Sequence, residues 1–141
     1  MKELRMIKVI GIQKDNKGIE NKIELITEGI CYKKKNNVYI VYEESEISGM
    51  EGATTTIKIE GEGKVSMRRF GSSDMQLIFQ KGKPYNSQYR TEFGQFEMKI
   101  YTNQLDVDLC NKTQKGSIAI QYDLWVAGLA DTTNELNIQL I

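Results

Sequence analysis

Residues 117–127 read SIAIQYDLWVA, and every second position is apolar: Ile118, Ile120, Tyr122, Leu124 and Val126. Strict alternation of this kind is typical of a β-strand with one face in a core and the other in solvent. Similar short segments fill most of the chain, separated by glycine- or asparagine-rich turns such as 15–18 and 35–37. Several short strands at this spacing predict an all-β sandwich or barrel. No segment of useful length carries the apolar pattern of an amphipathic helix.

The length and the two chain ends refine this prediction. A chain of 141 residues predicts one domain over residues 1–141, large enough to bury roughly two-thirds of its unfolded surface. The chain starts and ends in predicted strands, and pairing the first with the last would remove two exposed edges. We therefore predict a single antiparallel β-barrel, closed or nearly closed, of about eight to eleven strands.

The number of strands and the position of Gly29 complicate the predicted strand pattern. We count about eleven strands, but an antiparallel meander closes only with an even number. One boundary, between Tyr85 and Cys110, is therefore expected to be misplaced. Gly29 interrupts the long segment 19–34, and a glycine inside a strand often marks a bulge or a barrel corner.

The charge balance argues against nucleic-acid and membrane partners. Lysine plus arginine and aspartate plus glutamate both number 19, so the formal net charge is zero. A protein that follows a phosphate backbone needs a basic surplus. The first residues mix charged with apolar side chains, unlike a signal peptide, and no segment approaches the roughly 20 apolar residues of a membrane helix. We therefore expect a cytoplasmic protein.

The chain contains no histidine, which removes much of the usual catalytic chemistry. A Ser-His-Asp triad, a Cys-His dyad and a histidine-bound metal or haem all require that side chain. Cys31 and Cys110 match no metal or redox spacing, and we expect both to be buried and inert. No catalytic residue, metal site or cofactor is predicted, and an enzyme is the least favoured class.

Asp106 and Asp108 are spaced by two, so both carboxylates lie on one face of a predicted strand. Such a pair would suit a hard cation. The opposite face carries Leu105, Val107 and Leu109, which favours a core there and places the aspartates in solvent.

Arg69 shares its strand face with Val65 and Met67, the register expected to point inward. Inside a barrel, its planar guanidinium would anchor a carboxylate or phosphate through two hydrogen bonds. The alternative is a structural ion pair with a glutamate near the barrel end, because a buried charge requires a partner in either case.

Aromatic residues in the second half of the chain also point to a ligand site. Tyr89, Phe93 and Tyr122 would line a pocket and supply hydroxyls that orient a ligand; the alternative is ordinary barrel core. Trp125 lies on the polar face of its strand. This predicts an outward or rim position, where it would stack on a ligand or anchor a partner.

A longer pattern supports the same fold. RFG at 69–71 precedes the strand MQLIFQKG at 75–82, YRTEFG at 89–94, Thr102, IQYDL at 120–124 and Gly128. In order and spacing these segments resemble a family of small bacterial proteins, the DUF1934 or YwiB-like family, from about Gly29 to the end of the chain. The resemblance implies a calycin-like β-barrel, similar in shape to lipocalins, and no established activity. It implies the barrel mouth or lumen as the first place to look for a site.

Two functions are consistent with these features. The first is a cytoplasmic module that binds a small, partly apolar ligand, including one with an anionic group, in the lumen or mouth of the barrel. The residues expected to contact it are Arg69, Tyr89, Thr91, Phe93, Tyr122 and Trp125. The alternative is a structural barrel or protein–protein interaction module, including a homodimer, that uses its outer surface.

Overall fold

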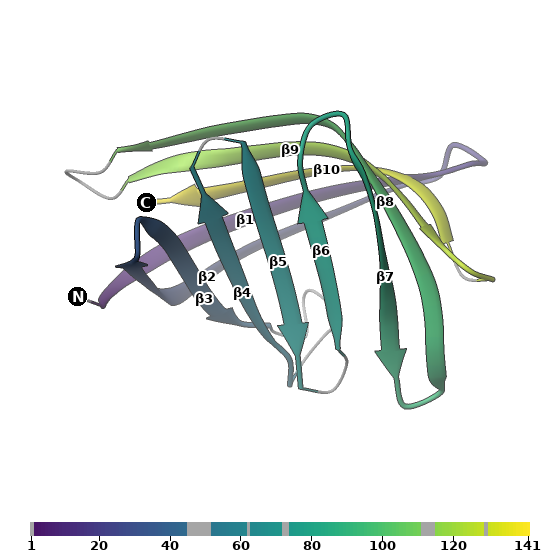
Figure 1. Ribbon diagram of the computed structural model, residues 1–141, viewed down its shortest axis with the longest axis horizontal. Helices are drawn as coiled ribbons and strands as arrows, with labels where there is room; N and C mark the ends of the chain where they lie inside the picture. Colours follow the sequence, from purple (N-terminus) through teal and green to yellow (C-terminus); the bar gives the residue numbers. More distant parts are fainter. Residues whose placement is uncertain (1, 45–51, 62, 72–73, 111–114, 129) are drawn as a thin grey trace.

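Every regular element that the structure describes is a β-strand, as the alternating sequence predicts (Figure 1). The computed structural model describes residues 2–44, 52–61, 63–71, 74–110, 115–128 and 130–141. Its strands are β1 (Glu3–Asp15), β2 (Glu20–Lys34), β3 (Asn37–Glu43), β4 (Thr54–Glu60), β5 (Lys64–Phe70), β6 (Met75–Phe79), β7 (Pro84–Thr91), β8 (Gly94–Cys110), β9 (Lys115–Val126) and β10 (Ala130–Leu140). Within these ranges no helix is long and apolar enough to cross a membrane.

The ten strands form one antiparallel sheet that curls into a nearly closed barrel. The strand order is β6-β5-β4-β3-β2-β1-β10-β9-β8-β7, so the first strand pairs with the last in the middle of the sheet. The β1–β10 register runs from Ile7–Leu140 to Asp15–Thr132, and the two chain ends lie on the same side of the barrel (Figure 1). The predicted barrel, with its first and last strands paired, is confirmed.

The barrel closes incompletely between β6 and β7, which are the two outer strands of the sheet. Asp74 and Arg90 exchange two backbone hydrogen bonds of 2.9 and 2.8 Å. Nearer the connecting turn, the Tyr85 hydroxyl donates to the Gln80 side chain at 2.6 Å. Between these points no backbone hydrogen bond joins the described residues of β6 to those of β7. We call this boundary the β6–β7 seam.

One strand boundary between Tyr85 and Cys110 was indeed misplaced. Segments 95–102 and 104–110 belong to the single strand β8, whose register against β9 shifts between Thr102 and Gln104. The extra residue, Asn103, reverses the alternation, so the buried positions change from Ile100 to Leu105. The reversal makes one bulged strand look like two strands in the sequence.

Gly29 does not interrupt β2, contrary to the expectation from the sequence. The β1–β2 register continues through it, opposite Arg5. A Cβ at this position would lie 2.6 Å from the Val41 carbonyl oxygen and would also overlap the Ile7 side chain. Glycine is therefore required by the close approach of β1 and β3, rather than by a bulge.

Inward-facing isoleucines fill one part of the barrel interior. Six described isoleucines are at most 1% exposed, and five of these come from five different strands: Ile7, Ile40, Ile57, Ile118 and Ile138. The sheet register places Ile118 directly beside Ile138. Burial of each such side chain stabilises the fold by roughly 1.5–3 kcal/mol. We call this region, defined by the five isoleucines, the filled half.

Candidate functional site

The rest of the interior contains a partly enclosed cavity of about 220 Å³. It lies toward the end of the barrel where β3 and β5 finish and β6 begins. Its wall is mainly apolar and is formed by Val9, Leu25, Met67, Met75, Leu77, Leu124 and Leu136. We call the cavity and the residues that line it the hollow half.

The sheet register brings a row of polar side chains to this cavity. Tyr42 on β3 pairs with Thr55 on β4, and Thr55 pairs with Arg69 on β5. Residues directly opposite each other on neighbouring strands point to the same face of the sheet, so all three face the interior. Glu44 follows Tyr42 by two residues and therefore points the same way.

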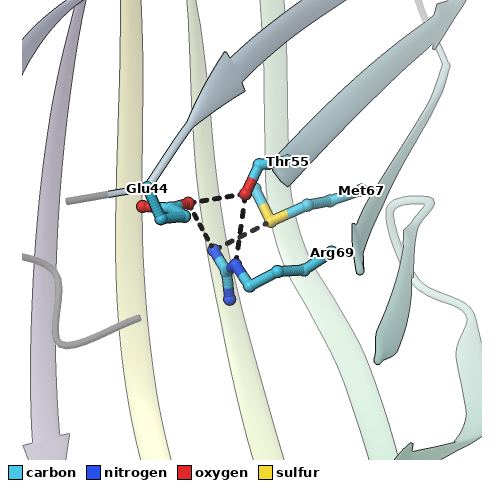
Figure 2. Close-up of polar contacts among 4 residues, drawn as sticks. All are labelled: Glu44, Thr55, Met67 and Arg69. Carbon is cyan, nitrogen blue, oxygen red and sulfur yellow. Dashed lines mark hydrogen bonds and ion pairs between the residues drawn. The ribbon is translucent and has the colours of Figure 1, made fainter. Parts of the chain in front are cut away.

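Glu44, Thr55 and Arg69 form a buried hydrogen-bonded cluster (Figure 2). Arg69 Nη2 lies 3.2 Å from Glu44 Oε1. Arg69 Nε donates to the Thr55 hydroxyl at 3.2 Å, and that hydroxyl donates to Glu44 Oε1 at 2.5 Å. The side chains of Arg69 and Glu44 are only 11% and 2% exposed. Each charge is therefore balanced by the other rather than by bulk water.

The predicted inward position of Arg69 is thus confirmed, together with a glutamate partner. Nη2 also lies 3.8 Å from Met67 Sδ on the same strand. Nη1, in contrast, makes no hydrogen bond to the described residues. The guanidinium therefore has one nitrogen available at the cavity that Arg69 lines.

A second polar row comes from the strands around the chain ends. Tyr122 on β9 pairs with Asn134 on β10, Asn134 pairs with Gln13 on β1, and Gln13 pairs with Asn21 on β2. All four residues line the cavity. Asn134 Nδ2 donates to the Thr132 hydroxyl at 2.9 Å. The lining of the cavity therefore combines its apolar wall with polar groups from two parts of the sheet.

Both tyrosines at the cavity keep their protons at neutral pH. Burial raises the pKa of Tyr122 to about 12, and the Arg69 guanidinium partly opposes this increase. Burial, followed by the Glu44 carboxylate, raises the pKa of Tyr42 above its ordinary value. A protonated phenol can donate a hydrogen bond, and the Tyr122 hydroxyl donates to none of the described residues.

The structure brings two of the six predicted ligand contacts, Arg69 and Tyr122, to the cavity. Tyr89 is half-buried and packs against the core from β7. The Thr91 hydroxyl accepts a hydrogen bond of 3.1 Å from the Phe93 backbone in the β7–β8 turn, and the Phe93 side chain is 86% exposed. These three residues do not contribute to the cavity lining.

Trp125 lies on the outer face of β9, in the outward position that the sequence predicts, and is 37% exposed. The Lys99 ammonium lies 5.1 Å from the centre of its ring. This contact is a cation–π interaction between neighbouring strands, and it is separate from the cavity.

Six polar residues of the site were missed in the sequence: Gln13, Asn21, Tyr42, Glu44, Thr55 and Asn134. Two of them could have been found from alternation alone. Thr55 occupies the inward register of its strand, and Glu44 continues the inward register of Tyr42. A polar residue at an inward position indicates a buried polar partner, although it does not identify that partner.

Other candidate chemistry lies away from the cavity. Asp106 and Asp108 are exposed, as their strand pattern predicts. Among the described residues, no three carboxylate or cysteine side chains gather as a metal site would require. Cys31 is buried, and burial raises the pKa of its thiol, which makes it less reactive. The side chain of Cys110 lies outside the described part of the structure.

The fold and the site together define a class: a small antiparallel β-barrel with an internal cavity and a buried ion pair. Comparison with known proteins identifies the family. The chain belongs to the DUF1934 family, described as a domain of unknown function, whose sequence profile matches residues 7–138. The resemblance in the sequence is thereby confirmed.

Two comparisons identify a relative from Bacillus subtilis. The uncharacterized beta-barrel protein YwiB of strain 168 is 34% identical over 113 residues, which cover 79% of this chain and 75% of YwiB. The crystal structure of the ywiB protein from Bacillus subtilis matches with a TM-score of 0.84 and 28% identity, and the match covers 99% of this chain and 91% of that one. The nearly closed barrel is therefore a feature of this relative as well.

Proposed function

We propose that this protein is a binding module that holds a small, partly apolar molecule in the cavity of the hollow half. The observation that carries the proposal is a mainly apolar cavity whose lining includes Glu44 and Arg69 of the buried cluster. Apolar walls with a few convergent polar groups are the usual makeup of small-molecule sites.

The size of the cavity limits the ligand. Its volume of about 220 Å³ is smaller than the roughly 300–1,000 Å³ typical of sites for drug-sized molecules. It is larger than an engineered apolar cavity of about 150 Å³ that binds benzene. The proposed ligand is therefore comparable to one substituted aromatic ring or a short acyl chain.

The buried ion pair also supports a binding role. A buried ion pair is often no more stabilising than apolar side chains of similar volume. The Glu44–Arg69 pair stands beside open space, where apolar residues would pack at least as well. Stabilisation of the fold therefore does little to explain why an ion pair occupies this position, whereas orientation of a bound ligand would explain it.

Native mass spectrometry tests the proposal directly. The protein would be purified gently from the cytoplasm, where we propose that it resides, and its native mass compared with its denatured mass. We expect a stoichiometric extra mass that disappears on denaturation. Leu124→Trp, which fills the cavity, should remove it, and Ile141→Trp on the outside should not. A bare native mass, together with no binding of small aromatic probes, would overturn the proposal.

A second function, self-association, is favoured by an exposed apolar patch. Leu4, Met6, Ile26 and Ile30 on the outer face of β1 and β2 are 68%, 43%, 57% and 38% exposed, and Leu4 pairs directly with Ile30. We propose that a second copy of the chain covers this patch, since large exposed apolar side chains gathered on one face often mark an interface. Sedimentation would show a dimer that Leu4→Lys dissociates; a strict monomer at micromolar concentration would contradict it.

A further inference from the structure

The charges around the cavity constrain the kind of molecule that fits there. Arg69 is the only cation among the described lining residues, and its guanidinium is already paired with Glu44. Glu135 also borders the cavity, but its exposed position between Asn134 and Leu136, which face the interior, places its carboxylate on the outer face of β10. The charges of Arg69 and Glu44 therefore cancel inside the cavity before any ligand enters.

An anionic ligand would be disfavoured by this balance. To pair with Arg69 it would have to compete with Glu44, whose Oε1 also accepts the hydrogen bond of 2.5 Å from Thr55. Without such pairing, the ligand would place in a buried site a negative charge that has no cationic partner, which is energetically costly. A cationic ligand meets a different obstacle, because the buried Glu44 is already neutralised.

The unused polar groups favour hydrogen bonding over charge pairing. Arg69 and Tyr122 line the cavity, and Arg69 Nη1 and the Tyr122 hydroxyl have no hydrogen-bond partner among the described residues. Both are donors, since the raised pKa of Tyr122 keeps its hydroxyl protonated. Donors left unsatisfied in a buried site are matched best by an acceptor such as a carbonyl oxygen.

We propose that the ligand of this cavity is an uncharged molecule with a carbonyl-type acceptor on an apolar body. This inference rests on the proposed binding function and specifies its ligand class. The carbonyl oxygen accepts from Arg69 Nη1 and from Tyr122, and the apolar body packs against Met67, Met75 and Leu77. Glu44 thus acts as a selectivity residue that cancels the attraction of Arg69 for anions.

A set of probes that share one shape tests the proposal. Benzamide, benzoate and benzamidine have the same size and differ in charge. Each would be titrated into the protein carrying ¹³C-labelled methionine methyl groups, observed by NMR. Met67 and Met75 report on the cavity, whereas Met6, which is 43% exposed on the outer face, reports on non-specific surface binding.

We expect benzamide to shift the Met67 and Met75 signals and to bind about tenfold more tightly than benzoate or benzamidine. Glu44→Gln should reverse the order of benzamide and benzoate, because it frees the charge of Arg69 while keeping the shape of the side chain. Asp106→Asn, which removes an exposed carboxylate on the outer face, is the matched control and should leave the order unchanged.

The outcomes separate this inference from the proposed function. Tighter binding of benzoate or benzamidine to the unmodified protein would overturn the uncharged ligand class and leave the binding function in place. Absence of cavity shifts with all three probes would contradict both proposals. The wild-type comparison decides between these outcomes even if Glu44→Gln fails to fold.

Discussion

The filled half and the hollow half of the barrel interior are formed in part by the same strands, but their side chains differ in polarity and packing. In the filled half, Ile118 and Ile138 are paired across β9 and β10 and are each 1% exposed. A few residues further along the same two strands, Tyr122 and Asn134 are paired and line open space. Along the inward face of β9 and β10, the side chains change from apolar to polar. This change marks the boundary between the tightly packed interior and the candidate site.

This difference predicts that substitutions of similar size will have unequal effects. A tightly packed region cannot relax into a deleted side chain, whereas a region that already contains a cavity has less packing to lose. The predictions that follow compare the two halves, from the largest expected change in stability to the smallest.

Ile118→Ala should have the largest effect. Removing this fully buried side chain leaves a new void in the filled half, and we expect a loss of about 3–4 kcal/mol in the free energy of unfolding. Leu124→Ala, in the hollow half, should cost only about 1–2 kcal/mol because that side chain is half-buried beside existing space. Urea denaturation measures both values. Equal losses would contradict the division into two halves.

Arg69→Met should destabilise the hollow half by roughly 3 kcal/mol, because it leaves the Glu44 carboxylate buried without its partner. Adding Glu44→Leu should recover most of the lost stability, since an apolar pair is often as stabilising as a buried ion pair. Denaturation of the single and double variants gives the comparison. A double variant as unstable as the single one would show that the cluster is required for folding.

Alkaline pH should weaken the hollow half through its two buried tyrosines. The pKa of Tyr122 rises from the ordinary 10 to about 12 in the folded protein, and that of Tyr42 rises as well. The unfolded chain therefore loses protons first. The stability contributed by these groups is fully present below pH 10 and is lost as the pH rises toward 12.

Each buried tyrosine is worth roughly 1.4 kcal/mol per pH unit in this window. We expect the free energy of unfolding to fall by roughly 2–3 kcal/mol between about pH 9 and about pH 11. Tyr122→Phe should remove about half of that dependence, measured by urea denaturation at each pH. The same slope in the variant would argue that Tyr122 titrates normally.

Phe93→Ser should have the smallest effect. Phe93 is 86% exposed in the β7–β8 turn, and surface substitutions of this kind usually change stability by less than about 0.5 kcal/mol. Binding of benzamide should also be unchanged, because the residue belongs to neither half of the interior. Weaker binding in this variant, followed by the same methionine signals, would extend the site to the turn.

Alternation was sufficient to predict most of the fold. It correctly assigned the inward faces of β5 and β9, including Arg69 and Tyr122, because one register decides every side chain on a strand. It failed at Asn103, where one extra residue reverses the alternation within β8. It also failed at Gly29. The requirement for glycine there comes from Ile7 and Val41, which are far from Gly29 in the sequence.

The candidate site was harder to predict because its parts meet only in the folded sheet. Glu44, Thr55 and Arg69 come from three segments of the chain, and only the registers of β3, β4 and β5 bring them together. The sequence indicates that Arg69 needs a glutamate, but several glutamates were available. Tyr89 and Phe93 resemble site residues by type, yet their positions on β7 and in its turn are set by pairing with β8.

The β6–β7 seam has a consequence for how the chain could be rearranged. Because β1 and β10 are neighbours within the sheet, residues 1 and 141 of this sequence could be joined by a short linker and new ends opened in the Gln80–Lys83 turn. Such a circular permutant would keep every continuous ladder of the sheet, since β6 and β7 share only the isolated Asp74–Arg90 bridge and the opened turn carries only the isolated Lys81–Thr102 bridge. The ends of the present chain therefore lie at a continuous ladder, between β1 and β10, whereas the ends of the permutant would lie beside the β6–β7 seam, where the sheet has no continuous ladder.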